Sequence, residues 1–320
     1  MESFADRLAV VTGGGSGIGR ELAVQLAAEG CDLALCDLSE ANLAETKARC
    51  ADANASVTVS THTCDVADED SVQAFRDAVL SAHVTEAVNL VFNNAGIGGG
   101  GSFVAGERDE WERTFNVCWG GVYNVARAFV PLLVAADAGH IVNTSSINGF
   151  WASLGPHTPH TAYSAAKFAV KGFSEALLTD LRLNAPHVKV SVVMPGHIGT
   201  DIVANSRTAM GREGPMSAEE VATMRKRLID RGLPVDNVPD DAIRQFAKQF
   251  ADDFRDKAPT TASEAAQIIL AGVRAGRWRI LVGADAEAID NAVRATPDEA
   301  YENDFMSALQ AEGHFTALIR

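Results

Sequence analysis

Short apolar runs alternate with longer helical stretches along most of this chain, and this alternation restricts its fold more than any other feature. The runs are continuous and rich in Val, Leu and Ile, which is typical of strands covered on both faces. Strict alternation of strand and helix implies right-handed crossovers, so it predicts an α/β fold with a doubly wound parallel sheet of about seven strands and helices on both faces. We expect strands at Leu8–Thr12, Asp32–Cys36, Val57–His62, Val88–Phe92, His140–Thr144, Val188–Val193 and Trp278–Val282, and helices at Gly17–Glu29, Glu40–Ala51, Asp68–Ala82, Glu107–Val134, Ala162–Asn184 and Ser263–Ala275.

The alternation stops after Thr200 and returns near residue 263. Residues 201–260 are polar and helix-rich, contain several Gly and Pro breakers, and show no strand-like run. We therefore interpret residues 1–320 as one domain in which 201–260 is a helical insertion. Residues 284–320 are expected to form a C-terminal extension of one or two helices.

The chain is acidic, with a formal net charge of −15 and a sequence pI of about 4.9. Such a surface disfavours nucleic acid and anionic membranes as partners. No apolar signal core follows the charged start, and the longest apolar stretch, Ala128–Ala136, is too short to span a bilayer. We expect a cytoplasmic protein without a metal site, because no CxxC pair or metal-ligand spacing occurs among Cys31, Cys36, Cys50, Cys64 and Cys118.

A glycine-rich segment, Thr12-Gly13-Gly14-Gly15-Ser16-Gly17-Ile18-Gly19, joins the first strand to the first helix. Glycines allow a tight turn and a close approach of backbone to a pyrophosphate, and the helix N-terminus supplies free N–H groups. Alone, such a segment could be a flexible turn, but its place between strand and helix favours a dinucleotide site of the Rossmann type. The residues expected to bind the cofactor here are Gly13, Ser16, Gly17, Ile18 and Gly19.

Asp37 ends the second strand, eighteen positions after Gly19. A carboxylate there can accept hydrogen bonds from both hydroxyls of the adenosine ribose and would repel a 2′-phosphate, so we expect NAD rather than NADP. The alternative is a helix N-cap, a role that Ser39 fills better. A second candidate segment, Asn93-Asn94-Ala95-Gly96, ends the fourth strand on the ligand side of the sheet. We expect the cofactor ribose to lie close to Asn93, Ala95 and Gly96; the alternative is an ordinary turn.

Tyr163 and Lys167 are four residues apart on a predicted helix, so they share a face. A free tyrosine is a poor base at neutral pH, and a nearby ammonium favours its phenolate. Ser146 follows the fifth strand, where a hydroxyl can donate to a substrate oxygen as charge develops on it. The alternative for Tyr163 and Lys167 is that they are ordinary side chains on a helix surface. The alternative for Ser146 is that it caps a turn.

Together, TGxxxGxG, Asp37, NNAG, the Ser-Ser strand end, YxxxK and Pro195-Gly196 occur in an order that strongly resembles the short-chain dehydrogenase/reductase family. The resemblance covers residues 5–200 and, more loosely, 262–283. It implies that Ser146 orients a carbonyl, that Tyr163 is the general acid/base, and that Lys167 binds ribose and tunes the tyrosine. It also implies a homodimer or homotetramer, and further cofactor contacts from Asp65, Val66, Pro195, Gly196, Ile198 and Thr200.

Three departures from the family pattern stand out. Cys118, not Asn116, falls where the family usually has an asparagine that completes a proton relay. The stretch from Ser146 to Tyr163 is longer than usual, and its extra residues, near 155–160, are expected to shape the substrate mouth. The insertion 201–260 is a candidate substrate cap, and a fairly hydrophobic substrate would fit its apolar residues, which could equally pack on the sheet: Ile202, Val203, Met210, Met216, Phe246 and Phe250.

We therefore expect an NAD-dependent oxidoreductase that interconverts a secondary alcohol and a ketone, with Tyr163 as general acid/base. Two alternatives stay open at this point. One is a catalytically weak NAD-binding sensor or scaffold, supported only by Cys118. The other is an NADP-dependent carbonyl reductase, opposed by Asp37.

Overall fold

Seven parallel strands form the central sheet in the described part of the chain, in the order β3-β2-β1-β4-β5-β6-β9. The structure is a computed structural model, and it describes residues 1–155, 158–230, 232–311 and 313–314. The predicted doubly wound α/β fold is confirmed. The strands are β1 (Leu8–Thr12), β2 (Asp32–Asp37), β3 (Val59–Thr63), β4 (Leu90–Asn93), β5 (Gly139–Thr144), β6 (Val188–Pro195) and β9 (Arg279–Val282).

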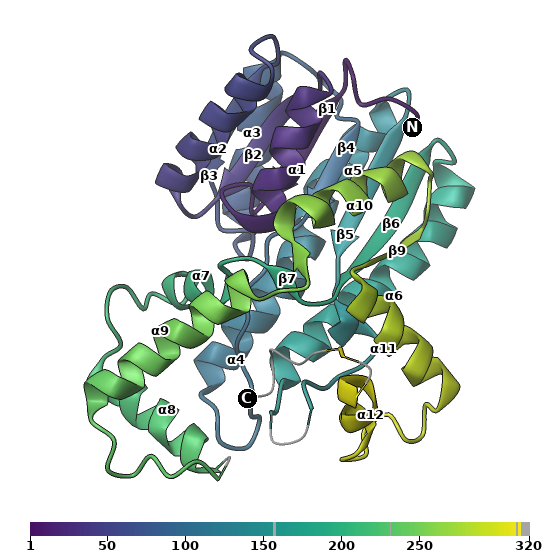
Figure 1. Cartoon of the computed structure of the whole chain (residues 1–320). Helices are drawn as coiled ribbons and strands as arrows, with labels where there is room; N and C mark the ends of the chain where they lie inside the picture. The colour runs from purple at the N-terminus through teal and green to yellow at the C-terminus, as the bar shows by residue number, and fades with distance from the viewer. Residues whose placement is uncertain (156–157, 231, 312, 315–320) are drawn as a thin grey trace.

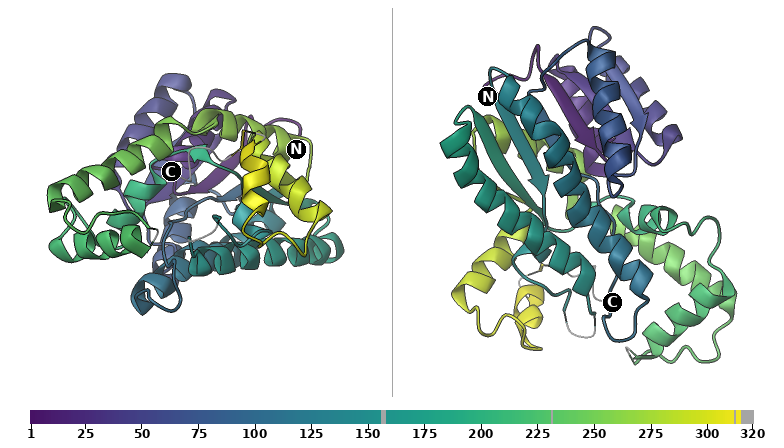
Figure 2. Two further views of the ribbon diagram at one scale, coloured as in Figure 1. Left: turned by 60° about the horizontal axis from the view of Figure 1, so that its bottom comes forward. Right: turned by 180° about the vertical axis from the view of Figure 1, so that it is seen from behind.

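Helices cover both faces of this sheet, as Figures 1 and 2 show from the front and from behind. Each face has its own buried apolar cluster, because central strands of a parallel sheet present Val, Leu and Ile to both sides. One face carries α1 (Gly17–Ala28), α2 (Glu40–Ala53) and α10 (Ala262–Arg274). The other carries α3 (Glu69–His83), α5 (Gly121–Ala135) and α6 (Thr161–Asn184).

The helix predicted at 107–134 is continuous but not regular. It consists of α4 (Arg108–Phe115), a π-helical turn η1 (Asn116–Gly120) and α5. By length and composition alone this helix, Arg108–Ala135, could cross a membrane, which the short apolar run at 128–136 did not suggest. In the fold it instead lies against the sheet, where α5 contacts β4 and β5, and half of its most apolar window is buried.

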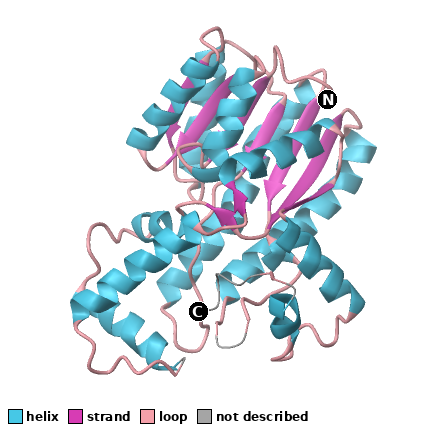
Figure 3. Ribbon diagram, in the orientation of Figure 1, coloured by secondary structure: helices cyan, strands magenta, loops and turns pink. Residues whose placement is uncertain are grey.

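Residues 201–260, called the cap below, stand beside the carboxyl ends of the strands (Figure 1). They contain α7 (Ile202–Ala209), α8 (Ala218–Asp230) and α9 (Asp240–Asp256). The prediction that this segment has no strand is wrong at its end. Thr260–Thr261 (β8) pairs with Ile198–Gly199 (β7) and closes the base of the cap (Figure 3). A two-residue pairing is too short to leave a periodic signal in the sequence.

The C-terminal extension contains α11 (Ala284–Ala295) and α12 (Phe305–Ala311). It packs on the loop that follows β5, which begins with a short 3-10 turn, η2 (Ile147–Gly149). Trp151 is fully buried there and its indole N–H donates to the carbonyl of Ala300 at 2.7 Å. The Tyr301 hydroxyl accepts the backbone N–H of Ala152 at 3.1 Å. The extension therefore supports the loop that follows Ser146, the predicted catalytic serine.

Candidate active site

A pocket of about 710 Å³ opens at the carboxyl ends of the strands, beside β1 and β4, where the strand order reverses. Ligands bind at such switch points in open α/β sheets, and the volume suits a small organic ligand. Most of the residues singled out from the sequence line this one pocket: Gly13, Ser16, Gly17, Ile18, Asp37, Asp65, Val66, Ala95, Gly96, Ser146, Tyr163, Lys167, Pro195, Gly196, Ile198 and Thr200.

Glycine is required at two positions of the glycine-rich loop. Gly17 has φ +52°, and a Cβ there would lie 3.1 Å from Thr200 on the opposite wall. Gly19 does not line the pocket; a Cβ on it would lie 2.1 Å from the carbonyl oxygen of Gly13, so glycine lets α1 pack against the loop. The residues at the start of α1 line the pocket, so the free N–H groups of its first turn lie beside it.

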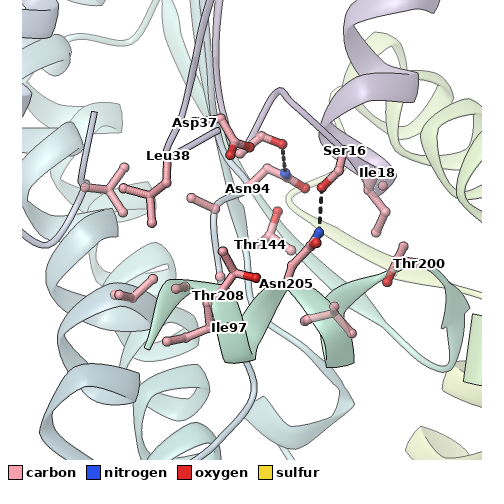
Figure 4. Close-up of a pocket in the computed structure, with 18 of the residues that line it drawn as sticks. Ser16, Ile18, Asp37, Leu38, Asn94, Ile97, Thr144, Thr200, Asn205 and Thr208 are labelled. Atoms are coloured by element: carbon pink, nitrogen blue, oxygen red, sulfur yellow. Dashed lines mark hydrogen bonds between the residues drawn. The ribbon is translucent and has the colours of Figure 1, made fainter. Parts of the chain in front are cut away.

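Asp37 points its carboxylate into the glycine loop. It accepts the backbone N–H groups of Gly15 and Ser39, both at 3.0 Å. The N-cap of α2 is Ser39, whose side chain accepts from Asn42, so Asp37 is not needed for that role. The carboxylate stays available at the edge of the pocket (Figure 4).

Two cations lie near this end of the pocket, and both are engaged. Arg113 donates to Asp65 at 2.7 Å. Arg20 donates to the carbonyl of Gly15 and forms an ion pair with Glu45 at 3.0 Å. Neither of these two guanidinium groups is free to offset the repulsion between Asp37 and a 2′-phosphate. The glycine cradle, the α1 N-terminus and Asp37 together fit a dinucleotide cofactor.

Asn93 lies outside the pocket, although the sequence suggested it as a cofactor contact. Its side chain is buried and donates to Asn143 at 2.8 Å on the neighbouring strand. The pocket is lined instead by Asn94, whose amide N–H groups reach the carbonyls of Thr12 and Gly13 at 3.1 and 3.4 Å. Asn94 thus ties the end of β4 to the glycine loop. The alternation of side chains along β4 was the sequence signal that separates the two asparagines.

Tyr163, Lys167 and Ser146 line the same pocket and lie close to one another. Lys167 lies 5.4 Å from the centroid of the Tyr163 ring and donates to the carbonyl of Thr144 at 2.8 Å. Burial raises the pKa of Tyr163 above its ordinary value, and the proximity of Cys118 adds to the rise, whereas a hydrogen bond with Ser146 opposes it. Burial likewise lowers the pKa of Lys167. The arrangement can hold a proton between a phenol and a bound oxygen while a serine hydroxyl fixes that oxygen.

Cys118 lies beside this pair, whereas Asn116 is exposed on the outer side of the helix. The Cys118 thiol is fully buried and donates to the carbonyl of Ile97 at 3.2 Å. It lies in the π-helical turn η1, and such turns are frequent at functional sites. The structure therefore places the thiol where the family pattern suggested an asparagine side chain.

The longer loop before α6 reaches Tyr163. The ring of His160 packs on that of Tyr163, with centroids 4.7 Å apart. Pro156 and His157, two of the residues expected at the substrate mouth, lie outside the described residues. Among the residues that the structure describes, no group of His, Cys, Asp or Glu is arranged to hold a metal ion.

The apolar residues of the cap divide among four environments. Ile202 lines the pocket, together with Phe254 of α9, which the sequence did not single out. Met210 packs on the core of the sheet, and Met216 packs inside the cap. Phe246 and Phe250 are 45% and 42% exposed on α9. Asn205 and Thr208 of α7 also line the pocket, and no pattern in the sequence identified them.

Comparison with known proteins supplies an independent view of this site. A family model described as short chain dehydrogenase matches residues 7–211. The chain is 37% identical over 294 residues to the "Putative oxidoreductase SadH" of Mycobacterium tuberculosis, covering 92% of each protein. A solved short chain dehydrogenase/reductase from Burkholderia phymatum, in complex with NAD, is 30% identical with a TM-score of 0.73, covering 93% of this chain and 95% of the other. A metagenomic short-chain oxidoreductase in complex with NADP is 31% identical with a TM-score of 0.54, covering 60% and 83%.

Proposed function

Because this chain belongs to the short-chain dehydrogenase/reductase family, we propose that it is an NAD-dependent enzyme that interconverts a secondary alcohol and a ketone. The observation that carries the proposal is the convergence of Ser146, Tyr163 and Lys167 on the pocket that also contains Asp37 and the glycine loop. When bound, the nicotinamide cofactor accepts or donates the hydride.

The chain's own residues handle the proton and the oxygen. The Ser146 hydroxyl, already oriented by the Asn148 N–H at 3.1 Å, donates to the substrate oxygen as charge develops on it. The phenol of Tyr163 gives a proton to that oxygen during reduction and takes it during oxidation. The buried ammonium of Lys167, next to the Tyr163 ring, stabilises the phenolate.

NAD is favoured over NADP by the adenosine end of the pocket. Asp37 is fixed by two backbone N–H groups, and Arg113 is paired with Asp65. An NADP-dependent carbonyl reductase would need a free cation beside the ribose. The relatives bound to NAD and to NADP are both similar to this chain, so the proposal depends on these residues.

The substrate is proposed to be fairly hydrophobic. The apolar side chains of Ile97, Val117, Ile202 and Phe254 line the pocket, the last two from the cap. A sensor or scaffold without catalysis would not need Ser146, Tyr163 and Lys167 together, so catalysis is the better explanation of this pocket.

We also propose a cytoplasmic homodimer or homotetramer. All five cysteines are free and buried, which suits a reducing compartment. Tyr123 and Val134 on α5 and Phe168 on α6 are each more than 40% exposed, and such apolar side chains on neighbouring helices suit a subunit interface.

NADH formation from NAD in a panel of apolar secondary alcohols tests the function, with NADP as the matched control. We expect turnover with NAD and at least about tenfold less efficiency with NADP, because a 2′-phosphate beside Asp37 is repelled. Asp37→Ser should reduce the difference in catalytic efficiency between NAD and NADP. Equal efficiency with both cofactors would contradict the cofactor assignment, and tight NADH binding without turnover on any alcohol or ketone would favour the sensor.

A further inference from the structure

Helix α7 of the cap crosses the cofactor pocket and is attached to both of its walls. On the glycine-loop side, the Asn205 amide donates to the Ser16 hydroxyl at 3.0 Å. On the other side, the Ser206 hydroxyl accepts the N–H of Gly98 at 2.8 Å, and the carbonyl of Ala209 accepts from Arg113 at 3.3 Å. Figure 4 shows Asn205 pointing from α7 toward Ser16 across the pocket.

The end of the pocket that Asn205 reaches is the one where a pyrophosphate belongs. Ser16 is the N-cap of α1, but its side chain makes no capping hydrogen bond and is turned toward Asn205. The N–H groups at the start of α1 are therefore left for an anion, with the positive end of the helix dipole behind them. Asn205 lies directly across from this helix terminus.

Cations are scarce along this pocket. Of its described lining residues, the basic ones are Arg113 and Lys167. Arg113 is paired with Asp65, and Lys167 lies beside Tyr163 and donates to Thr144. The two negative charges of a pyrophosphate must then be met by neutral N–H donors, and each such hydrogen bond to a charged oxygen is stronger than one to a neutral acceptor.

We propose that Asn205 is a cofactor-binding residue supplied by the cap. The inference rests on the proposed function and adds to it a residue of the helix that covers the pocket. One N–H of the Asn205 carboxamide stays on Ser16 and the other donates to a pyrophosphate oxygen. Bound dinucleotide thereby strengthens the attachment of α7 to the glycine loop, and α7 must separate from Ser16 before the cofactor leaves.

Binding of cofactor fragments to the whole protein tests this without any substrate. The ligands are adenosine, ADP-ribose and NADH, measured by calorimetry and by NADH fluorescence. The variants are Asn205→Ala and the isosteric Asn205→Asp, which places a negative charge toward the phosphates. Ala204→Asp is the matched control, because Ala204 is exposed on the same helix and does not line the pocket.

We expect Asn205→Ala to weaken the binding of ADP-ribose and NADH by about tenfold or more. The affinity for adenosine should not change, because adenosine has no phosphate. Asn205→Asp should weaken both pyrophosphate ligands further, and Ala204→Asp should act like the wild type. NADH release in stopped flow should be faster from both Asn205 variants. Melting curves verify that each variant is folded.

Three results would overturn the inference: ADP-ribose affinity unchanged in Asn205→Ala, an equal loss for adenosine, or the same loss in Ala204→Asp. Failure of the wild type to bind either NADH or NADPH is a different outcome. It would overturn the proposed function itself, and the inference with it.

Discussion

At the scale of single residues, Cys118 is the departure from the family pattern with the clearest chemical consequence. The buried thiol donates to the carbonyl of Ile97. A thiol is a weaker hydrogen-bond donor than an amide and has fewer donor and acceptor sites. Its nearness also adds to the raised pKa of Tyr163. The thiol thus occupies the space beside Tyr163 and Lys167 but forms fewer and weaker hydrogen bonds than an asparagine amide would.

This difference predicts opposite effects of two substitutions. Cys118→Asn should raise kcat several-fold, because the amide can keep the hydrogen bond to Ile97 and add a polar partner near Lys167. Cys118→Ala should lower kcat, because it removes the hydrogen bond and leaves a small cavity. Steady-state kinetics under saturating NAD measure both, and equal kcat in all three proteins would contradict a role for this position.

The buried phenol predicts the pH dependence of the two directions. Alcohol oxidation needs the phenolate of Tyr163, and because burial raises the pKa of this phenol, the phenolate becomes available only as pH increases. Oxidation should therefore speed up from pH 7 to 9. Ketone reduction needs the protonated phenol, which a raised pKa preserves across that range, so the reduction rate should change much less with pH than the oxidation rate. Rate profiles in both directions provide the measurement, and an oxidation rate that falls with pH would exclude Tyr163 as the base.

The limits of sequence reasoning are visible at Asn93 and Asn94. Both stand in a motif that suggests a ribose contact, but the pleat of β4 turns Asn93 toward Asn143 and leaves Asn94 facing the glycine loop. Asn205 was not predictable at all, because its function depends on where the cap folds back. Asp37 and Ser146 were predictable because they follow strands whose apolar runs are plain in the sequence, whereas the position of Asn205 in a long insertion was not.

At the scale of elements, the contact between the glycine loop and α1 determines the shape of the cofactor site. The strand and helix that flank the loop follow directly from their apolar patterns, so their positions could be predicted. The π-helical turn at 116–120 could not, because a single widened turn is too short to leave a periodic signal in the sequence. It is set by packing against α6 and the loop after β4.

Two glycine substitutions test the importance of the loop contact. Gly19→Ala brings a Cβ to 2.1 Å from the Gly13 carbonyl oxygen, so α1 must move and NADH affinity should drop at least about tenfold. Gly172→Ala is the matched control, because a Cβ at that position on α6 meets nothing within 4 Å. There the better helix propensity of alanine should stabilise the protein by up to about 1 kcal/mol. Fluorescence titration and thermal melting report the two effects, and unchanged NADH binding in Gly19→Ala would contradict the account.

At the scale of the whole molecule, the active site is assembled from three parts of the chain. The sheet and the helices that cover it supply the glycine loop, Ser146, Tyr163 and Lys167. The cap supplies α7, and the C-terminal extension supports the loop after Ser146. The seven-stranded parallel sheet was predictable because buried parallel strands give continuous apolar runs. The positions of the cap and extension depend on individual contacts such as Trp151 to Ala300 and were not predictable.

The extension should matter for stability as well as for catalysis. Trp151→Ala removes a fully buried indole and its hydrogen bond to Ala300, at a cost of about 3–5 kcal/mol. The melting temperature should drop by several degrees, and kcat should fall more than NADH affinity because the loop carrying Ser146 loses its support. Trp151→Phe, which keeps an aromatic ring, should show a smaller loss of both. A melting temperature equal to that of the wild type in Trp151→Ala would show that the extension does not stabilise this loop.

The central claim is that Tyr163 exchanges a proton with the substrate in an NAD-linked reaction, and Tyr163→Phe tests it most directly. The measurement is kcat for NADH formation from a responsive secondary alcohol, made beside the NADH dissociation constant of the same variant. We predict a loss of kcat of about 10²-fold or more with little change in NADH affinity, because the phenylalanine keeps the ring and removes only the hydroxyl. Turnover in Tyr163→Phe close to that of the wild type would contradict the claim.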